Sequence, residues 1–101
     1  MASKTDPYSK KVTEQFVKFE SVGDEVHGRL VQVGRAVMPG GEVGRYVVEN
    51  ESGRYAFLGS VGIDNHLTGK RIGYDFKLVY TGEITTGGGR PLKQFDLFER
   101  S

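Results

Sequence analysis

The sequence lacks cysteine and tryptophan, and only three of its 101 residues are proline. Without cysteine it can form neither a disulfide framework nor a thiolate metal site. No apolar run approaches the ~20 residues of a membrane span, and the first residues, MASKTDPYSKK, lack the apolar core of a secretory signal. These absences predict a soluble protein of the reducing cytoplasm with no membrane partner.

The length of 101 residues fits one domain with a modest core, and it is too short for a second core or a deep catalytic cleft. The first residues are polar and include Pro7. We therefore expect residues 1–15 to form a loosely attached leader and residues 16–101 to form a single domain.

Fifteen glycines fall between runs of alternating apolar and polar residues, a pattern typical of short strands joined by tight turns. Val12, Phe16 and Phe19 have the spacing of a short helix, although an extended entry into the sheet fits the same residues. The pattern further predicts strands at 25–37, 45–50, 54–59, 71–84 and 93–98, and a helix capped by Ser60 and ended by Gly69.

The clearest alternation lies in the fourth of these strands. Its apolar set, which we expect to face the core together with Phe95 and Leu97 of the last strand, comprises Ile72, Tyr74, Phe76, Leu78 and Tyr80. Three strands, a short helix and two strands is the order of the five-stranded Greek-key barrel called the OB-fold, with the helix between strands three and four. The sequence therefore predicts an all-β OB-fold, with an SH3-like barrel as the second choice.

The charges are distributed unevenly although the net charge is only +1. An OB-fold binds ligands in one groove, walled by the loop between strands one and two and the loop between strands four and five. Arg35 and Arg45 flank the first loop, and Arg90 and Lys93 flank the second, whose glycines 87–89 can bend over a polyanion. The alternatives are ordinary surface scatter for the cations and a soft hairpin turn for the glycines.

Aromatic residues supply the second element that a site for single-stranded nucleic acid requires, because unpaired bases stack on flat rings. Tyr46, Tyr55 and Phe57 on the second and third strands are the candidates, with Arg54 beside Tyr55 and Lys77 extending the cationic track. Periodicity leaves open which of these rings face the solvent and which belong to the core.

The stretches FESVGDEVHGRL, GRYAFLGS, GYDFKLVYTGE and GGGRPLKQFDL resemble those of small bacteriophage single-stranded DNA-binding proteins of OB-fold type. The resemblance covers roughly residues 16 to 98. It implies sequence-tolerant binding of single-stranded DNA, or of RNA, during replication or recombination in the host cytoplasm, by a homo-oligomer such as a dimer. It does not extend to the acidic tail with which bacterial relatives recruit partners, because this chain ends in DLFERS.

Catalytic motifs are missing from the sequence. His27 and His66 have no ligand partners at metal-binding spacing, the stretch GGGRPLK lacks the lysine spacing of a phosphate-binding loop, and no pair of carboxylates has a reason to differ in protonation. We expect neither enzymatic activity nor a metal or cofactor. The alternative function is an OB-fold protein–protein interaction module, an adaptor or inhibitor with no nucleic-acid role.

Overall fold

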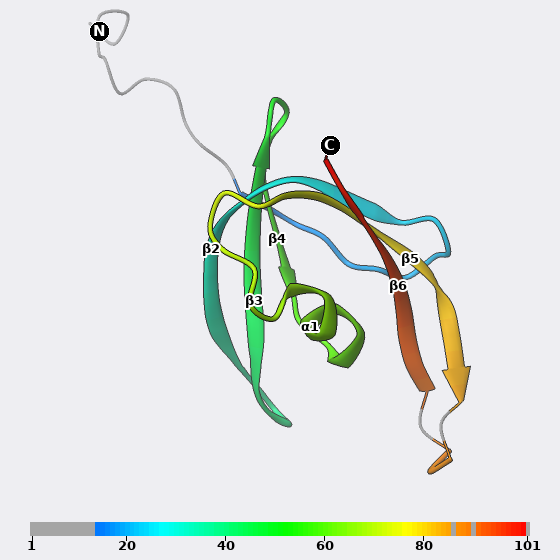
Figure 1. Cartoon of the computed structure of the whole chain (residues 1–101). Helices are drawn as coiled ribbons and strands as arrows, with labels where there is room; N and C mark the ends of the chain where they lie inside the picture. Colours follow the sequence, from blue (N-terminus) through cyan, green and yellow to red (C-terminus); the bar gives the residue numbers. More distant parts are fainter. Residues whose placement is uncertain (1–13, 86, 90, 101) are drawn as a thin grey trace, which may run out of the picture.

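A computed structural model describes residues 14–85, 87–89 and 91–100 (Figure 1). The protein is mostly β, with one short helix and one six-stranded sheet in the order β1-β4-β3-β2-β5-β6. The elements are β1 (Glu14–Phe16), β2 (Glu25–Met38), β3 (Gly41–Asn50), β4 (Gly53–Leu58), α1 (Val61–Leu67), β5 (Asp75–Thr85) and β6 (Pro91–Glu99).

The prediction of an all-β protein with one short helix is confirmed, and the five predicted strands correspond to β2 through β6. The short helix predicted near Phe16 is wrong. Glu14–Phe16 instead forms β1, a strand that was not predicted, and it runs parallel to β4. The pairing continues past β1, because the Val17 backbone N–H donates to the Ala56 carbonyl at 2.8 Å. Because β1 begins at Glu14, it already includes the last two residues of the expected leader, whose remaining residues lie outside the described part of the chain.

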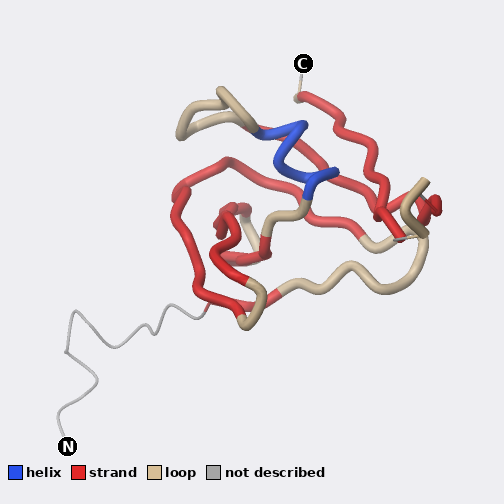
Figure 2. The backbone as a smooth tube through the Cα atoms, turned by 90° about the horizontal axis from the view of Figure 1, so that it is seen from below, coloured by secondary structure: helices blue, strands red, loops and turns tan. Residues whose placement is uncertain are grey.

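The long strand β2 pairs with β5 through its first part and with β3 through its second part. Where β2 changes its partner from β5 to β3, its backbone comes so close to that of β3 that a glycine is required. Gly28 has a φ of +146°, and a Cβ atom there would lie 2.6 Å from the Glu49 carbonyl oxygen. A bulge between Leu30 and Gln32 then shifts the register against β3 by one residue. The strands consequently curl around a common interior instead of lying flat (Figure 2).

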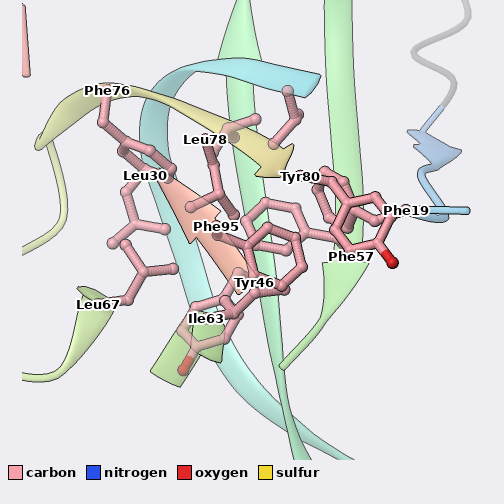
Figure 3. Close-up of a cluster of buried hydrophobic side chains, with 12 residues drawn as sticks. Phe19, Leu30, Tyr46, Phe57, Ile63, Leu67, Phe76, Leu78, Tyr80 and Phe95 are labelled. Carbon is pink, nitrogen blue, oxygen red and sulfur yellow. The ribbon is translucent and has the colours of Figure 1, made fainter. Parts of the chain in front are cut away.

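The core fills the concave side of this curled sheet and confirms the predicted inward positions of β5 and β6, except that Ile72 lies exposed in the turn before β5. The segment after β1 closes the core by inserting Phe19, whose ring lies 5.9 Å from that of Phe57 and 5.0 Å from that of Phe95, edge to face in both cases (Figure 3). The buried cluster is Phe19, Val26, Leu30, Tyr46, Val48, Phe57, Ile63, Leu67, Phe76, Leu78, Tyr80 and Phe95.

Helix α1 is fixed to strands on both of its sides. Ser60 stands at the predicted N-cap position, although its side chain makes no capping hydrogen bond to a described residue, and Gly69, at a φ of +80°, follows the C-cap residue Thr68. The Tyr46 hydroxyl of β3 donates to Asp64 Oδ1 at 2.6 Å, and His66 Nε2 donates to the Phe95 carbonyl of β6 at 2.8 Å. The helix therefore lies between the β2–β3 and β5–β6 hairpins, which extend from the same end of the molecule (Figure 1).

Replacing Gly28 with alanine should destabilise the fold, because the new Cβ atom must adopt a positive φ and contact the β3 backbone. We expect the free energy of unfolding to fall by at least about 2 kcal/mol in urea denaturation. Gly34→Ala, in the same strand, is the matched control, since a Cβ there meets no atom within 4 Å. Equal effects of the two substitutions would show that β2 does not approach β3 as described.

Candidate nucleic-acid interface

The face of the sheet opposite the core, here called the outer face, carries a row of charges of alternating sign. The row crosses five adjacent strands in register and consists of Glu14, Arg54, Glu49, Arg29 and Asp75. Glu49 accepts from both neighbouring arginines, at 3.1 Å from Arg54 Nε and 3.3 Å from Arg29 Nη2. Arg100 Nη1 extends the row with a 3.6 Å contact to Asp75 Oδ2.

A further ion pair, between Arg45 of β3 and Glu14 of β1, crosses the outer face diagonally. In the sheet register, Val47, Ala56 and Phe16 form the row of residues that lies between these two partners. Val47 and Ala56 are fully buried although they do not belong to the core cluster. The aliphatic stems of the paired side chains therefore cover a small apolar strip, as long charged residues often do.

The predicted cations are not all brought together. Arg45, Arg54 and Lys77 share the outer face, whereas Arg35 lies on the opposite side of the β2–β3 hairpin, where its Nε lies 3.6 Å from Glu42 Oε1. The bulge in β2 causes this separation, because the residues after the bulge are turned by one position relative to those before it. Arg35 and Arg45 therefore both flank the turn of this hairpin but on opposite faces, so they do not form one wall of a groove.

The second predicted wall of the groove also differs from the expectation. Lys93 points toward the edge of the core. Its Nζ donates to the Phe19 carbonyl at 2.7 Å and lies 5.5 Å from the centre of the Tyr80 ring. Arg90 lies outside the described residues. The described glycines of this hairpin, 87–89, are exposed and form part of its turn.

Two of the three predicted stacking rings are in the core. Tyr46 is 8% exposed and Phe57 is fully buried, and their rings stack on each other with centres 5.6 Å apart (Figure 3). A base cannot reach either ring without disrupting the core, which corrects the expectation for both residues. Tyr55 is half-buried and packs against the same cluster.

The sequence analysis missed two aromatic side chains that are open to solvent. Phe16 of β1 is 51% exposed and Phe98 of β6 is 50% exposed, and both lie on the outer face by register. Phe98 had a signal, since Phe95 and Leu97 were expected to face inward and strand alternation turns the residue after Leu97 outward. Phe16 has no such signal, because its spacing from Phe19 fits a helix as well as an extended strand.

Three tyrosine hydroxyls have raised pKa values. Burial and then the hydrogen bond to Asp64 raise the pKa of Tyr46 far above its usual range. Burial raises the pKa of Tyr74 to about 12, assisted by the 2.9 Å hydrogen bond that its hydroxyl donates to Glu99. Burial also raises the pKa of Tyr80, with nearby Glu83 adding to the effect. Each hydroxyl remains protonated at neutral pH, so none is prepared to act as a base.

Among the described residues, no group of three or more histidine, aspartate and glutamate side chains is arranged to hold a metal ion. No helix in the described part of the chain is long and apolar enough to cross a membrane. Comparisons with protein-family models, with curated proteins and with solved structures find no match to this chain.

Alkaline titration should expose the raised pKa values. A hydroxyl whose pKa is higher in the folded state stabilises the fold below the unfolded value of 10.0, and this contribution is lost as the pH rises toward the folded value, about 12 for Tyr74. Ultraviolet absorbance titration should therefore show late-titrating tyrosines, and the free energy of unfolding should decrease above pH 10.

Tyr46→Phe should remove one late-titrating hydroxyl and lower stability at neutral pH by about 1 to 3 kcal/mol, because Asp64 loses its donor. Tyr55→Phe is the control, since the Tyr55 hydroxyl has no hydrogen bond to any described residue. Comparable losses in both variants would contradict the assigned role of the Tyr46–Asp64 bond.

Proposed function

We propose that this protein binds single-stranded DNA without strong sequence preference, through the outer face of its sheet. The observation that carries the proposal is the placement of three arginines, Arg29, Arg45 and Arg54, on the same face of the sheet as the exposed ring of Phe16. Guanidinium groups bind phosphates, and an open ring accepts any base by stacking. The first contact depends on the charge of the phosphate and the second on the flat surface of the base, and all four nucleotides have both. Binding of this kind therefore does not distinguish sequences.

The element order supports an OB-fold as the scaffold. Strands β2, β3 and β4, then α1, then β5 and β6 follow the OB-fold order, and α1 lies between the two hairpins that would wall the groove (Figure 1). The sheet departs from a closed barrel because β1 lies beside β4 at one end of the strand order and β6 stands at the other. Strands β4 and β6 are not paired with each other in the strand order, and the side chain of Phe19 packs between them against Phe57 and Phe95.

The ion pairs on the outer face are compatible with DNA binding. Pairs between exposed side chains contribute only about 0.2 to 1 kcal/mol each, so a phosphate can replace a carboxylate at small cost. The arginines of the row retain side-chain exposures of 58% for Arg29 and 42% for Arg54. In this proposal the carboxylates hold the guanidinium groups in position until a nucleic acid binds.

The proposed role is binding without catalysis and without a cofactor. His66 is occupied by its bond to the Phe95 carbonyl, and His27 lies exposed on the outer face. Neither arrangement provides the nucleophile, base and orienting group that covalent catalysis uses.

A different surface favours the alternative function, a protein interaction module. Val33 and Val37 are exposed on the side of the β2–β3 hairpin that also carries Arg35, and Val37 is 83% exposed. Exposed apolar side chains around a cation suit a protein partner, including the second copy of the chain that a dimer requires. Val37→Asp should abolish such association in light scattering and leave DNA binding by the outer face intact.

Titration of a fluorescent single-stranded oligonucleotide at several salt concentrations tests the proposed function. Four cations of the outer face, Arg29, Arg45, Arg54 and Lys77, are proposed to contact phosphates, so log affinity should fall against log salt with a slope of roughly −3, at about −0.7 per contact. Arg54→Ala should make the slope less negative by about 0.7. Absence of binding at low salt, to DNA and to RNA of the same sequence, would refute the proposal.

Glu49→Gln should tighten binding several-fold, because this carboxylate is paired with two arginines that would otherwise be free for phosphates. Glu51→Gln is the matched control, since it makes the same charge change in the adjacent turn and Glu51 forms no ion pair with a described residue. Fluorescence anisotropy at fixed salt measures both. Equal gains in the two variants would mean that net charge alone, and not release of the arginines, is responsible.

A further inference from the structure

A second row of side chains on the outer face lies next to the row of Arg29 and Asp75, two residues further along each strand. This second row combines a cation with a solvent-exposed aromatic ring. In register across β2, β5 and β6 it consists of His27, Lys77 and Phe98. Lys77 Nζ lies 5.3 Å from the centre of the Phe98 ring, within the range of a cation–π contact. These residues also border a shallow pocket of about 280 Å³.

Lys77 differs from the arginines of the same face in its charge balance. Arg29, Arg45, Arg54 and Arg100 each have a carboxylate partner. Lys77 forms no ion pair with any described residue and instead contacts the face of an aromatic ring. Lys77 is therefore a position on the described outer face where positive charge is not already neutralised and where a phosphate has no paired carboxylate to displace.

The Phe98 ring has room for a second flat partner. Lys77 approaches the ring from the β5 side, and β6 is the last strand in the sheet order, so the described residues place no neighbouring strand on the other side of the ring. Half of the side chain is exposed. An unpaired base can stack there while its flanking phosphate contacts Lys77, the combination that non-specific binders of single strands use.

We propose that Lys77 and Phe98 form a second nucleotide-binding position, in which one base stacks on Phe98 and an adjacent phosphate contacts Lys77. This inference rests on the proposed function and extends it from the β1–β4 edge to the opposite edge of the sheet. Phe16 and Phe98 lie on the first and last strands of the sheet order. A nucleic acid that follows the outer face from one ring to the other therefore passes the arginines of β2, β3 and β4.

The acidic residues around this position define the direction of the bound strand. Glu25 and Asp96 lie in the next same-face row beyond Lys77, on either side of Val79. On the other side of Lys77 lie Arg29, paired in register with Asp75, and Arg100. Asp75 is paired with Arg100, whereas Glu25 and Asp96 form no ion pair with a described residue, so a polyanion leaving Lys77 is repelled less toward the arginines than toward Glu25.

Two variants and a matched control test the position, using the full chain and an oligothymidine of about 12 nucleotides, within the range bound by one OB-fold. Phe98→Ala should weaken binding roughly tenfold by removing one stacked base, with an unchanged salt slope. Lys77→Gln should make the salt slope less negative by about 0.7. Val61→Ala truncates an exposed apolar residue on α1, outside the sheet, and should change neither quantity.

Thermal melts of each variant establish that losses of binding are not losses of folding, and the Lys77 substitution tests the position independently should Phe98→Ala fail to fold. Wild-type affinity and slope in both variants, while the wild-type protein binds, would overturn this position and leave the proposed function standing. Failure of the wild-type protein to bind any single strand at low salt would instead overturn the proposed function, and this position with it.

Discussion

Strand β2 pairs with β5 over its first part and with β3 over its second. Its register therefore determines which side chains of these three strands face the core and which face the solvent. With Leu30 opposite Val48, the apolar residues face the interior and Arg29 faces the solvent opposite Glu49. A slip of one residue would exchange the two faces of the strand. The close approach at Gly28 fixes this register, because no side chain fits between the two backbones there.

Much of the fold follows from the period-two pattern, because burial on one face alone is enough to produce it. Phe76, Leu78 and Tyr80 alternate with Asp75, Lys77 and Val79 on the other face of the strand and are all buried. The first strand could not be predicted in this way, since three residues carry too little periodicity. Its position depends on Phe19, whose ring packs between Phe57 and Phe95 from elsewhere in the chain, and tertiary contacts of this kind leave no local sequence signal.

The candidate site was less predictable than the fold, for two physical reasons. A bulge changes which residues share a face, and the sequence does not give the position of the bulge between Leu30 and Gln32 that separates Arg35 from Arg45. Strands with apolar residues on both faces also leave the orientation of their rings undetermined, so Tyr46 and Phe57 were placed in the site although both lie in the core. The carboxylate partners of Arg29, Arg45 and Arg100 depend on strand pairings distant in sequence, which local pattern does not give.

These pairings also bear on the objection that a chain of net charge +1 attracts nucleic acid weakly. Affinity for a polyanion depends on local contacts and on the counterions that the polyanion releases, and the net charge enters mainly through long-range attraction. Each arginine that exchanges Glu49 or Glu14 for a phosphate gives up a weak surface pair and gains a contact whose favourable entropy comes from released salt. In the proposed function, an outer face that is balanced when free would therefore bind DNA at low salt and release it as salt rises.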